Sequence, residues 1–206
     1  MIGCKICGIS DPKTLTYIVD HPHPPQFVGF IVNWKASSRY VELDRLKELL
    51  NIDKKKSKYV AVVVKNDEST LEKIKDLPFD YYQMYDCSPE EIIKIKEKYN
   101  KKIIAALTIE NKEDVKKYKN YENFSDIILF DGKGYAESVG FNHDLLNEVP
   151  DHINKMIAGN IKIEDLPNFK NKHYIIDASG NLESQRGIKD INKIDKFLNT
   201  VHNINS

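Results

Sequence analysis

The sequence is poor in several features that would each have indicated a particular class of protein. It has only three cysteines in 206 residues, too few for a disulfide framework. It has no excess of either charge, because 31 lysines and arginines balance 31 aspartates and glutamates. A nucleic-acid-binding domain normally carries a basic excess, so that class is disfavoured. Apolar runs such as Tyr59–Val64 are far shorter than the ~20 residues that a membrane helix needs. We therefore expect neither a nucleic-acid partner nor a membrane partner.

What the chain does have is enough apolar material for a core. Hydrophobic residues make up 41% and charged residues 30% of the chain, which excludes a disordered protein. The length fits one domain spanning residues 1–206. The N-terminal residues lack a basic segment followed by a long apolar one, so we expect no signal peptide. Together with an odd number of thiols, this favours the reducing cytoplasm.

Short apolar runs rich in β-branched and aromatic residues recur along the chain. They are continuous rather than alternating, as expected of parallel strands covered on both faces. The predicted strands are Cys4–Cys7, Phe27–Val32, Tyr59–Val64, Tyr81–Met84, Ile103–Leu107, Ile127–Phe130, Met156–Ala158 and Tyr174–Asp177.

Amphipathic segments separate these runs. Leu43–Leu50 places leucines on one face and charges on the other, which predicts a helix. Ser88 followed by Pro89 is typical of a helix start, with apolar residues continuing to Tyr99. Lys189–Val201 repeats the helical pattern. Eight such βα units predict an α/β protein, a (βα)8 TIM barrel near the lower size limit of that fold, with an open doubly wound sheet as the alternative.

In a parallel barrel, the active site lies at the strand C-termini, which allows the candidate residues to be sorted by position. Cys7 ends the first strand and completes a C-x-x-C pair with Cys4. Residues i and i+3 of a strand point to opposite faces, so the pair can bind a metal or act as a dithiol only if this segment turns. Otherwise Cys7 is either a small buried hydrophobe or a reactive group at the barrel mouth.

Two further candidates follow other strands. Arg39 lies in the loop after the second strand and is one of only three arginines. Arginine suits a bidentate grip on a carboxylate, although scarcity alone proves little. Asp131 follows the sixth strand and precedes Gly132. Asp-Gly is a common turn, but a carboxyl at a barrel mouth can also be a general acid or base when burial raises its pKa.

Small residues follow the seventh and eighth strands. They form the loops Ala158–Ile161 and Asp177–Asn181, each containing a glycine that lets the backbone approach a ligand closely. In barrels, this location commonly binds phosphate through backbone N–H groups. The two adjacent loops therefore predict a phosphate site.

Taken together, these segments resemble phosphoribosylanthranilate isomerase, the tryptophan-pathway family. The similarity covers essentially the whole chain in the family's order, and its most specific parts are the opening motif and the Ser-x-Arg-Tyr element. The matching segments are Lys5–Ile9, Phe27–Ile31, Ser37–Val41, Gln83–Met84, Leu129–Asp131, Ala158–Gly159, Asp177–Gly180 and Gly187–Asp190.

The resemblance implies a cytoplasmic (βα)8 barrel without a cofactor or metal, a monomer or homodimer acting on a small phosphorylated sugar. The family converts N-(5-phosphoribosyl)anthranilate to a carboxyphenylamino-deoxyribulose phosphate by an Amadori rearrangement. By that resemblance Cys7 is the general base, Asp131 the general acid, and Arg39 the ligand of the substrate carboxylate. The phosphate would be held by residues of the two glycine loops, namely Gly159, Asn160, Ser179 and Gly180.

The chain departs from the family's pattern at three points, one of which is the aromatic motif after the sixth strand, preserved only loosely as Phe141–His143. Asn160 stands where the family usually has a second glycine, and asparagine tolerates left-handed backbone better than most residues. Tyr85 and Asp86 replace a His-Gly pair, which places an additional carboxylate near the expected mouth.

Other interpretations stay open on the sequence alone. The histidine-pathway barrel isomerase acts on a similar aminoaldose that carries two phosphates, but the third strand here exits into Lys65–Thr70, which has no glycine for a second phosphate. A phosphate-ligand-binding barrel without activity is a second alternative. A thiol-redox or metal module built on Cys4 and Cys7 is a third.

Overall fold

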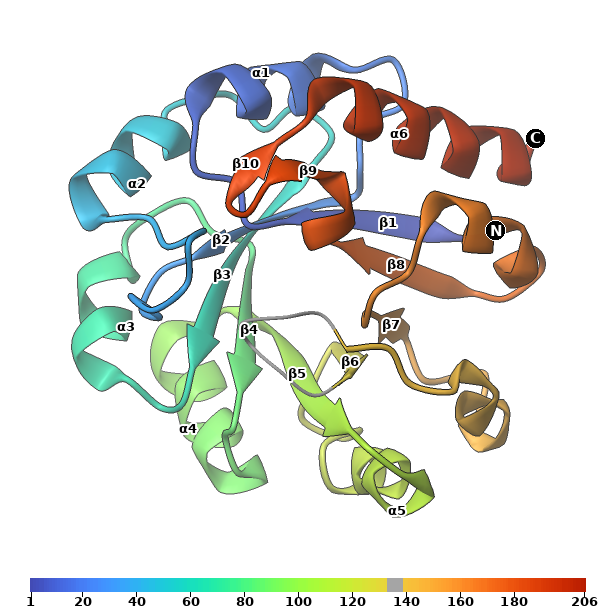
Figure 1. The fold of residues 1–206 in the computed structure, drawn as a ribbon. Helices are drawn as coiled ribbons and strands as arrows, with labels where there is room; N and C mark the ends of the chain where they lie inside the picture. The colour runs from blue at the N-terminus through green and yellow to red at the C-terminus, as the bar shows by residue number, and fades with distance from the viewer. Residues whose placement is uncertain (133–138) are drawn as a thin grey trace.

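Eight parallel strands close into a barrel in this computed structural model, which describes residues 1–132 and 139–206 (Figure 1). Each strand pairs with its neighbours in the chain, and β8 pairs with β1. The predicted (βα)8 barrel is therefore confirmed, and the open sheet is excluded. The strands are β1 (Gly3–Cys7), β2 (Phe27–Ile31), β3 (Lys58–Val64), β4 (Tyr81–Tyr85), β5 (Lys102–Ile109), β6 (Ile127–Gly132), β7 (Lys155–Ile157) and β8 (Tyr174–Ala178).

Helices surround the barrel in Figure 1, and the first and last of them lie side by side. Tyr17 of α1 donates a hydrogen bond of 2.7 Å to Asp195 of α6, which closes the outer layer. The α-helices are α1 (Pro12–Asp20), α2 (Leu43–Leu50), α3 (Glu68–Ile74), α4 (Pro89–Tyr99), α5 (Lys112–Lys116) and α6 (Ile191–Asn205).

Two of the three predicted helices match the structure closely, and one begins later than expected. α2 has the predicted bounds, and α4 begins with a capping box in which Ser88 and Glu91 satisfy each other's backbone N–H groups. α6 starts at Ile191 with Asp190 as its N-cap. Lys189, predicted as the helix start, instead lies in β10 (Ile188–Lys189), paired with β9 (Glu183–Gln185).

Short 3-10 helices replace α-helices in the last part of the barrel. Three of them follow β6, β7 and β8, and α6 comes only after the last of these. They are η2 (His143–Glu148), η3 (Ile163–Phe169) and η4 (Gly180–Leu182), and η1 (Lys117–Asn120) extends α5. Pro167 lies within η3 and has no backbone N–H to continue an α-helix.

The apolar side chains form two clusters separated by the barrel wall. Residues of β3 show the alternation: Val60, Val62 and Val64 belong to the cluster inside the barrel, whereas Ala61 and Val63 belong to the cluster under the helices. β1 follows the same rule, with Cys7 in the inner cluster and Cys4 in the outer one. Side-chain periodicity thus decides which residues reach the barrel interior and its mouth.

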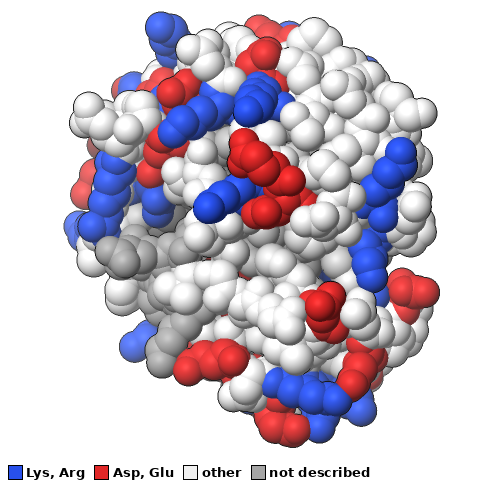
Figure 2. All heavy atoms as spheres, turned by 45° about the vertical axis from the view of Figure 1, so that its right-hand side comes forward, with Lys and Arg blue, Asp and Glu red and all other residues white. Residues whose placement is uncertain are grey.

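The surface carries both charges intermixed. On the face shown in Figure 2, basic and acidic side chains alternate over short distances, consistent with the zero net charge. In the described ranges, none of the helices has the length and apolarity to cross a membrane.

Candidate active site

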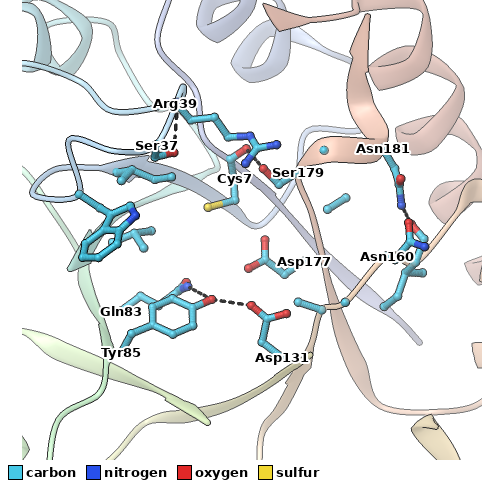
Figure 3. Close-up of a pocket in the computed structure, with 18 of the residues that line it drawn as sticks. Cys7, Ser37, Arg39, Gln83, Tyr85, Asp131, Asn160, Asp177, Ser179 and Asn181 are labelled. Atoms are coloured by element: carbon cyan, nitrogen blue, oxygen red, sulfur yellow. Dashed lines mark hydrogen bonds between the residues drawn. The ribbon is translucent and has the colours of Figure 1, made fainter. Parts of the chain in front are cut away.

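The C-terminal ends of the strands form a pocket that contains every residue predicted from the sequence as part of the site (Figure 3). Its polar lining comes from β1, β4, β6 and β8 and from the loops that follow β2, β7 and β8. These residues are Cys7, Ser37, Arg39, Gln83, Tyr85, Asp131, Asn160, Asp177, Ser179 and Asn181, with Gly159 and Gly180 beside them. These residues are spread from position 7 to position 181 of the chain, and closure of the barrel brings them together.

Cys7 is the last residue of β1, and its sulfur points into the pocket (Figure 3). It pairs with Gly29 of β2, where an added Cβ would lie 2.9 Å from the Cys7 Sγ atom. The glycine therefore makes room for the thiol. Cys4 lies on the other side of the barrel wall, so the two thiols do not face each other and the dithiol hypothesis is wrong. The cysteines are free and buried, and the described part of the chain holds no group of side chains suited to a metal ion.

Burial shifts the pKa of Cys7 above its usual value. The charge of Lys5 is the largest opposing influence, followed by effects of Asp177, which raises the pKa, and of Lys189, which lowers it. A buried thiol needs such a cation to become a thiolate, the form that accepts protons.

Asp131 lies within β6, and the predicted Asp-Gly turn is wrong because Asp131 and Gly132 both continue the strand. Its carboxyl faces the pocket and accepts a hydrogen bond of 2.8 Å from the hydroxyl of Tyr85. Gln83 in turn donates to that hydroxyl at 3.3 Å. Burial raises the pKa of Asp131 to about 7, although the Tyr85 hydrogen bond acts in the opposite direction. A carboxyl with such a pKa can hold a proton near neutral pH and release it.

Of the Tyr85–Asp86 pair that replaces the family's His-Gly, only the tyrosine takes part in the pocket. Tyr85 reaches into the pocket and contacts Asp131, whereas Asp86 is exposed, has a left-handed backbone (φ 51°) and does not line the pocket. The expected extra carboxylate therefore stays outside the site.

Arg39 already has a bidentate carboxylate partner within the chain. Its Nε and Nη2 atoms donate to the two oxygens of Glu183 at 2.5 and 3.0 Å. Lys189 donates to the same carboxylate at 2.9 Å, and the backbone of Gly187 does so at 2.9 Å. Burial raises the pKa of Glu183, but Arg39, Lys189 and Gly187 lower it to about 2, so this carboxylate stays ionised. Glu183 thus engages the Nε–Nη2 edge of the guanidinium, and no hydrogen bond from Nη1 is found among the residues that the structure describes.

The two predicted glycine loops border the same pocket. Gly159 has φ 95°, and a Cβ there would lie 2.9 Å from the carbonyl oxygen of Val139, so only glycine fits. Asn160 follows in the left-handed region (φ 55°), as expected of its tolerance for this backbone. In the other loop, the Ser179 hydroxyl donates to the carbonyl of Cys7 at 3.1 Å. This bond ties the eighth strand's loop to the end of the first strand.

Four pocket-side residues were missed by the sequence analysis. Lys5 and Asp177 form a buried ion pair of 2.7 Å inside the barrel, and Glu183 and Lys189 form the pair that holds Arg39. Two signals could have found the first pair: Lys5 and Cys7 share a face of the strand, and Asp177 ends the eighth predicted strand.

A family model and curated relatives indicate the same family. A family model described as N-(5'phosphoribosyl)anthranilate (PRA) isomerase matches residues 4–200. The curated N-(5'-phosphoribosyl)anthranilate isomerase of Agrobacterium fabrum is 31% identical, over 96% of this chain and 94% of the relative.

Solved structures show the same fold. The phosphoribosyl anthranilate isomerase of Thermotoga maritima superposes with a TM-score of 0.87 at 22% identity, covering 98% of this chain and 100% of the other. A phosphoribosyl anthranilate isomerase in complex with reduced 1-(o-carboxyphenylamino)-1-deoxyribulose 5-phosphate superposes with a TM-score of 0.85 at 22% identity and the same coverage.

Proposed function

This chain belongs to the N-(5'-phosphoribosyl)anthranilate isomerase family, and from that premise we propose that Cys7 and Asp131 are its general base and general acid. The enzyme is an isomerase of tryptophan biosynthesis. Its substrate is N-(5-phosphoribosyl)anthranilate and its product 1-(2-carboxyphenylamino)-1-deoxyribulose 5-phosphate. The observation that carries the assignment of roles is the convergence of a thiol and a carboxyl of raised pKa on one pocket.

The reaction needs an acid first and a base second. Asp131 donates its proton to the ring oxygen of the sugar, the C1–O bond breaks, and the electron pair of the anilino nitrogen forms an iminium at C1. The Cys7 thiolate then takes the C2 proton, and the electrons of that bond form the C1=C2 bond of a neutral enolamine. Addition of a proton at C1 and loss of the enol proton give the ketone. The protonated form of Asp131 near neutral pH supports the first step.

Arg39 and the glycine loops hold the two charged ends of the substrate in this proposal. The Nη1–Nη2 edge of Arg39 binds the anthranilate carboxylate, because Glu183 engages the Nε–Nη2 edge. Gly159, Asn160, Ser179 and Gly180 bind the phosphate, supported by their close-approach backbone and their place after β7 and β8. The reaction is an internal transfer of protons and needs no cofactor.

We also propose the cytoplasm as the compartment, a choice supported by the three free, buried thiols. A monomer or a homodimer of one domain over residues 1–206 remains the expected form, with the phosphorylated sugar as its partner.

A fluorescence assay that follows loss of phosphoribosylanthranilate tests this function. We expect the wild-type enzyme to consume the substrate, and Arg39→Lys to raise KM at least about tenfold with a smaller change in kcat. An ammonium cannot replace the bidentate fork, so the loss falls on substrate binding. A wild-type protein that binds a phosphorylated product analogue without consuming substrate would instead identify a binding barrel without activity.

A further inference from the structure

The role of Cys7 as a base, on which this inference rests, raises a physical problem. The side chain is buried, and burial favours the neutral thiol over the thiolate. Proton abstraction needs the thiolate. A neighbouring positive charge must therefore compensate for the lost hydration.

Lys5 is placed to supply that charge. It precedes Cys7 by two residues on β1, so both side chains enter the barrel interior. Lys5 is completely buried. A Cβ on Gly29 would lie 2.9 Å from the Cys7 Sγ and 3.1 Å from the Lys5 Nζ, so both atoms border one small space that the glycine leaves open.

Asp177 and the Cys7 sulfur both favour the charged form of this buried lysine. The Oδ2 atom of Asp177 accepts a hydrogen bond of 2.7 Å from the Lys5 Nζ, across the pairing of β1 with β8. Burial lowers the pKa of Lys5. The charges of Asp177 and Cys7 together raise it by more, so the net shift is upward. An ammonium has three protons, and Asp177 accepts one of them, which leaves donors for the sulfur.

We propose that Lys5 is the positioning residue that makes Cys7 a base, because its ammonium borders the same space as the sulfur and stabilises the thiolate inside the barrel. When the thiolate takes the C2 proton, Cys7 becomes a neutral thiol. Lys5 and Asp177 then remain as a neutral ion pair, and Lys5 keeps its own protons throughout. Asp177 has the opposite influence on the thiolate, because its negative charge disfavours a second anion beside the same ammonium.

Charged and titratable groups face Cys7 from several elements. Lys5 and Asp177 come from the barrel interior, and the others surround the mouth. Among the residues that the structure describes, these groups are Lys5 of β1, Asp177 of β8, Lys189 of β10, Arg39 of the loop after β2, Tyr85 of β4 and Asp131 of β6.

Alkylation of Cys7 by iodoacetamide at a series of pH values measures its thiolate directly. A background with Cys4→Ser and Cys87→Ser leaves Cys7 as the one thiol, and Cys7→Ser gives the blank. Lys5→Met should raise the midpoint of alkylation by at least about one pH unit, which slows the reaction about tenfold below the midpoint. Asp177→Asn should shift the midpoint in the opposite direction, to lower pH.

Lys155→Met is the matched control. Lys155 is also a buried lysine, but its Nζ bonds the carbonyls of Val149 and Pro150 and it does not line the pocket. Its removal should leave the midpoint of Cys7 unchanged. A general loosening of the fold would speed alkylation in every variant. The proposal instead requires the midpoint to rise in Lys5→Met and to fall in Asp177→Asn.

An unchanged midpoint in a folded Lys5→Met protein would overturn the proposal, and so would a shift of both variants in one direction. If circular dichroism shows that Lys5→Met does not fold, an unchanged or raised midpoint in Asp177→Asn is by itself enough to overturn the proposal. Alkylation does not depend on turnover. A wild-type protein that fails to consume phosphoribosylanthranilate would therefore refute the proposed function and leave the thiol result readable.

Discussion

Asp131 shows how a single side chain acquires its chemistry from opposing neighbours. Burial stabilises its protonated form, while the hydroxyl of Tyr85 donates to its carboxylate form at 2.8 Å. The balance brings its pKa to about 7. Position in the sequence predicted Asp131 and Cys7 as candidates because each follows a strand. The contact between Lys5 and Asp177 could not be predicted, since the two residues are 172 apart in the chain and only barrel closure joins them.

Tyr85→Phe tests the balance at Asp131. Loss of the donor removes an influence that lowers the pKa of Asp131, so that pKa should rise above about 7. Because the acid must be protonated to act, the alkaline limb of kcat/KM should move to higher pH by about one unit. Tyr99→Phe is the matched control, since Tyr99 also donates to a carboxylate, Glu72, but does so outside the barrel. An alkaline limb that stays in place or moves to lower pH would refute this account of Tyr85.

The hairpin of β9 and β10 is an element that serves the site without lining it. Glu183 begins β9 and Lys189 ends β10, and together they hold Arg39 and the carbonyl of Ser179. The eight strands were predictable, because their apolar runs are continuous. The hairpin could not be predicted. Lys189 fits the amphipathic pattern of the helix that follows, and nothing in the sequence distinguishes its partner Glu183 from other charged residues.

Glu183→Gln tests the hairpin's role. The neutral amide leaves Arg39 and Lys189 without their shared anion, so the guanidinium should lose its fixed orientation. We expect KM to rise about tenfold with kcat within roughly twofold, as for a loss of binding rather than of chemistry. Steady-state kinetics on phosphoribosylanthranilate measures both. Glu48→Gln, which removes the acceptor of Arg45 on the exposed side of α2, should change neither. A fall in kcat at constant KM would contradict the positioning role.

At the scale of the whole molecule, the barrel stabilises a site that itself costs stability. Its first and last segments are joined by β1–β8 pairing and by two hydrogen bonds between Ile2 and Asn205. Inside it lie a buried acid, a buried thiol and a buried ion pair, groups that an apolar core would not need. The closed architecture was predictable from the number and spacing of the strands, but the charges within it were not.

The cost appears in the pH dependence of unfolding. The pKa of Asp131 is about 7 in the folded chain and about 3.9 when unfolded, so the folded state binds more protons between these values. Its contribution to stability is therefore complete below about pH 4 and is lost as the pH rises towards about 7. The Asp131→Asn variant has no titrating carboxyl here, so it does not lose stability in this way, and its amide oxygen still accepts the Tyr85 hydrogen bond. Its free energy of unfolding should exceed that of wild type by roughly 2–4 kcal/mol at pH 8 and match it near pH 4.

Urea unfolding at the two pH values measures this difference. Asp44→Asn, at an almost fully exposed carboxylate on α2, should show no pH-dependent gain. An Asp131→Asn protein that is no more stable than wild type at pH 8 would show that the buried carboxyl carries no such penalty.

The central claim is that Cys7 and Asp131 act as one unit on one sugar, and kcat for Cys7→Ser, Asp131→Asn and the double variant tests it most directly. We predict that each single variant loses at least about a thousandfold in kcat, and that the double variant loses little more, because either group is useless without the other. All three should bind reduced carboxyphenylamino-deoxyribulose phosphate nearly as well as wild type. Turnover near the wild-type rate in either single variant, or multiplied losses in the double variant, would contradict the claim.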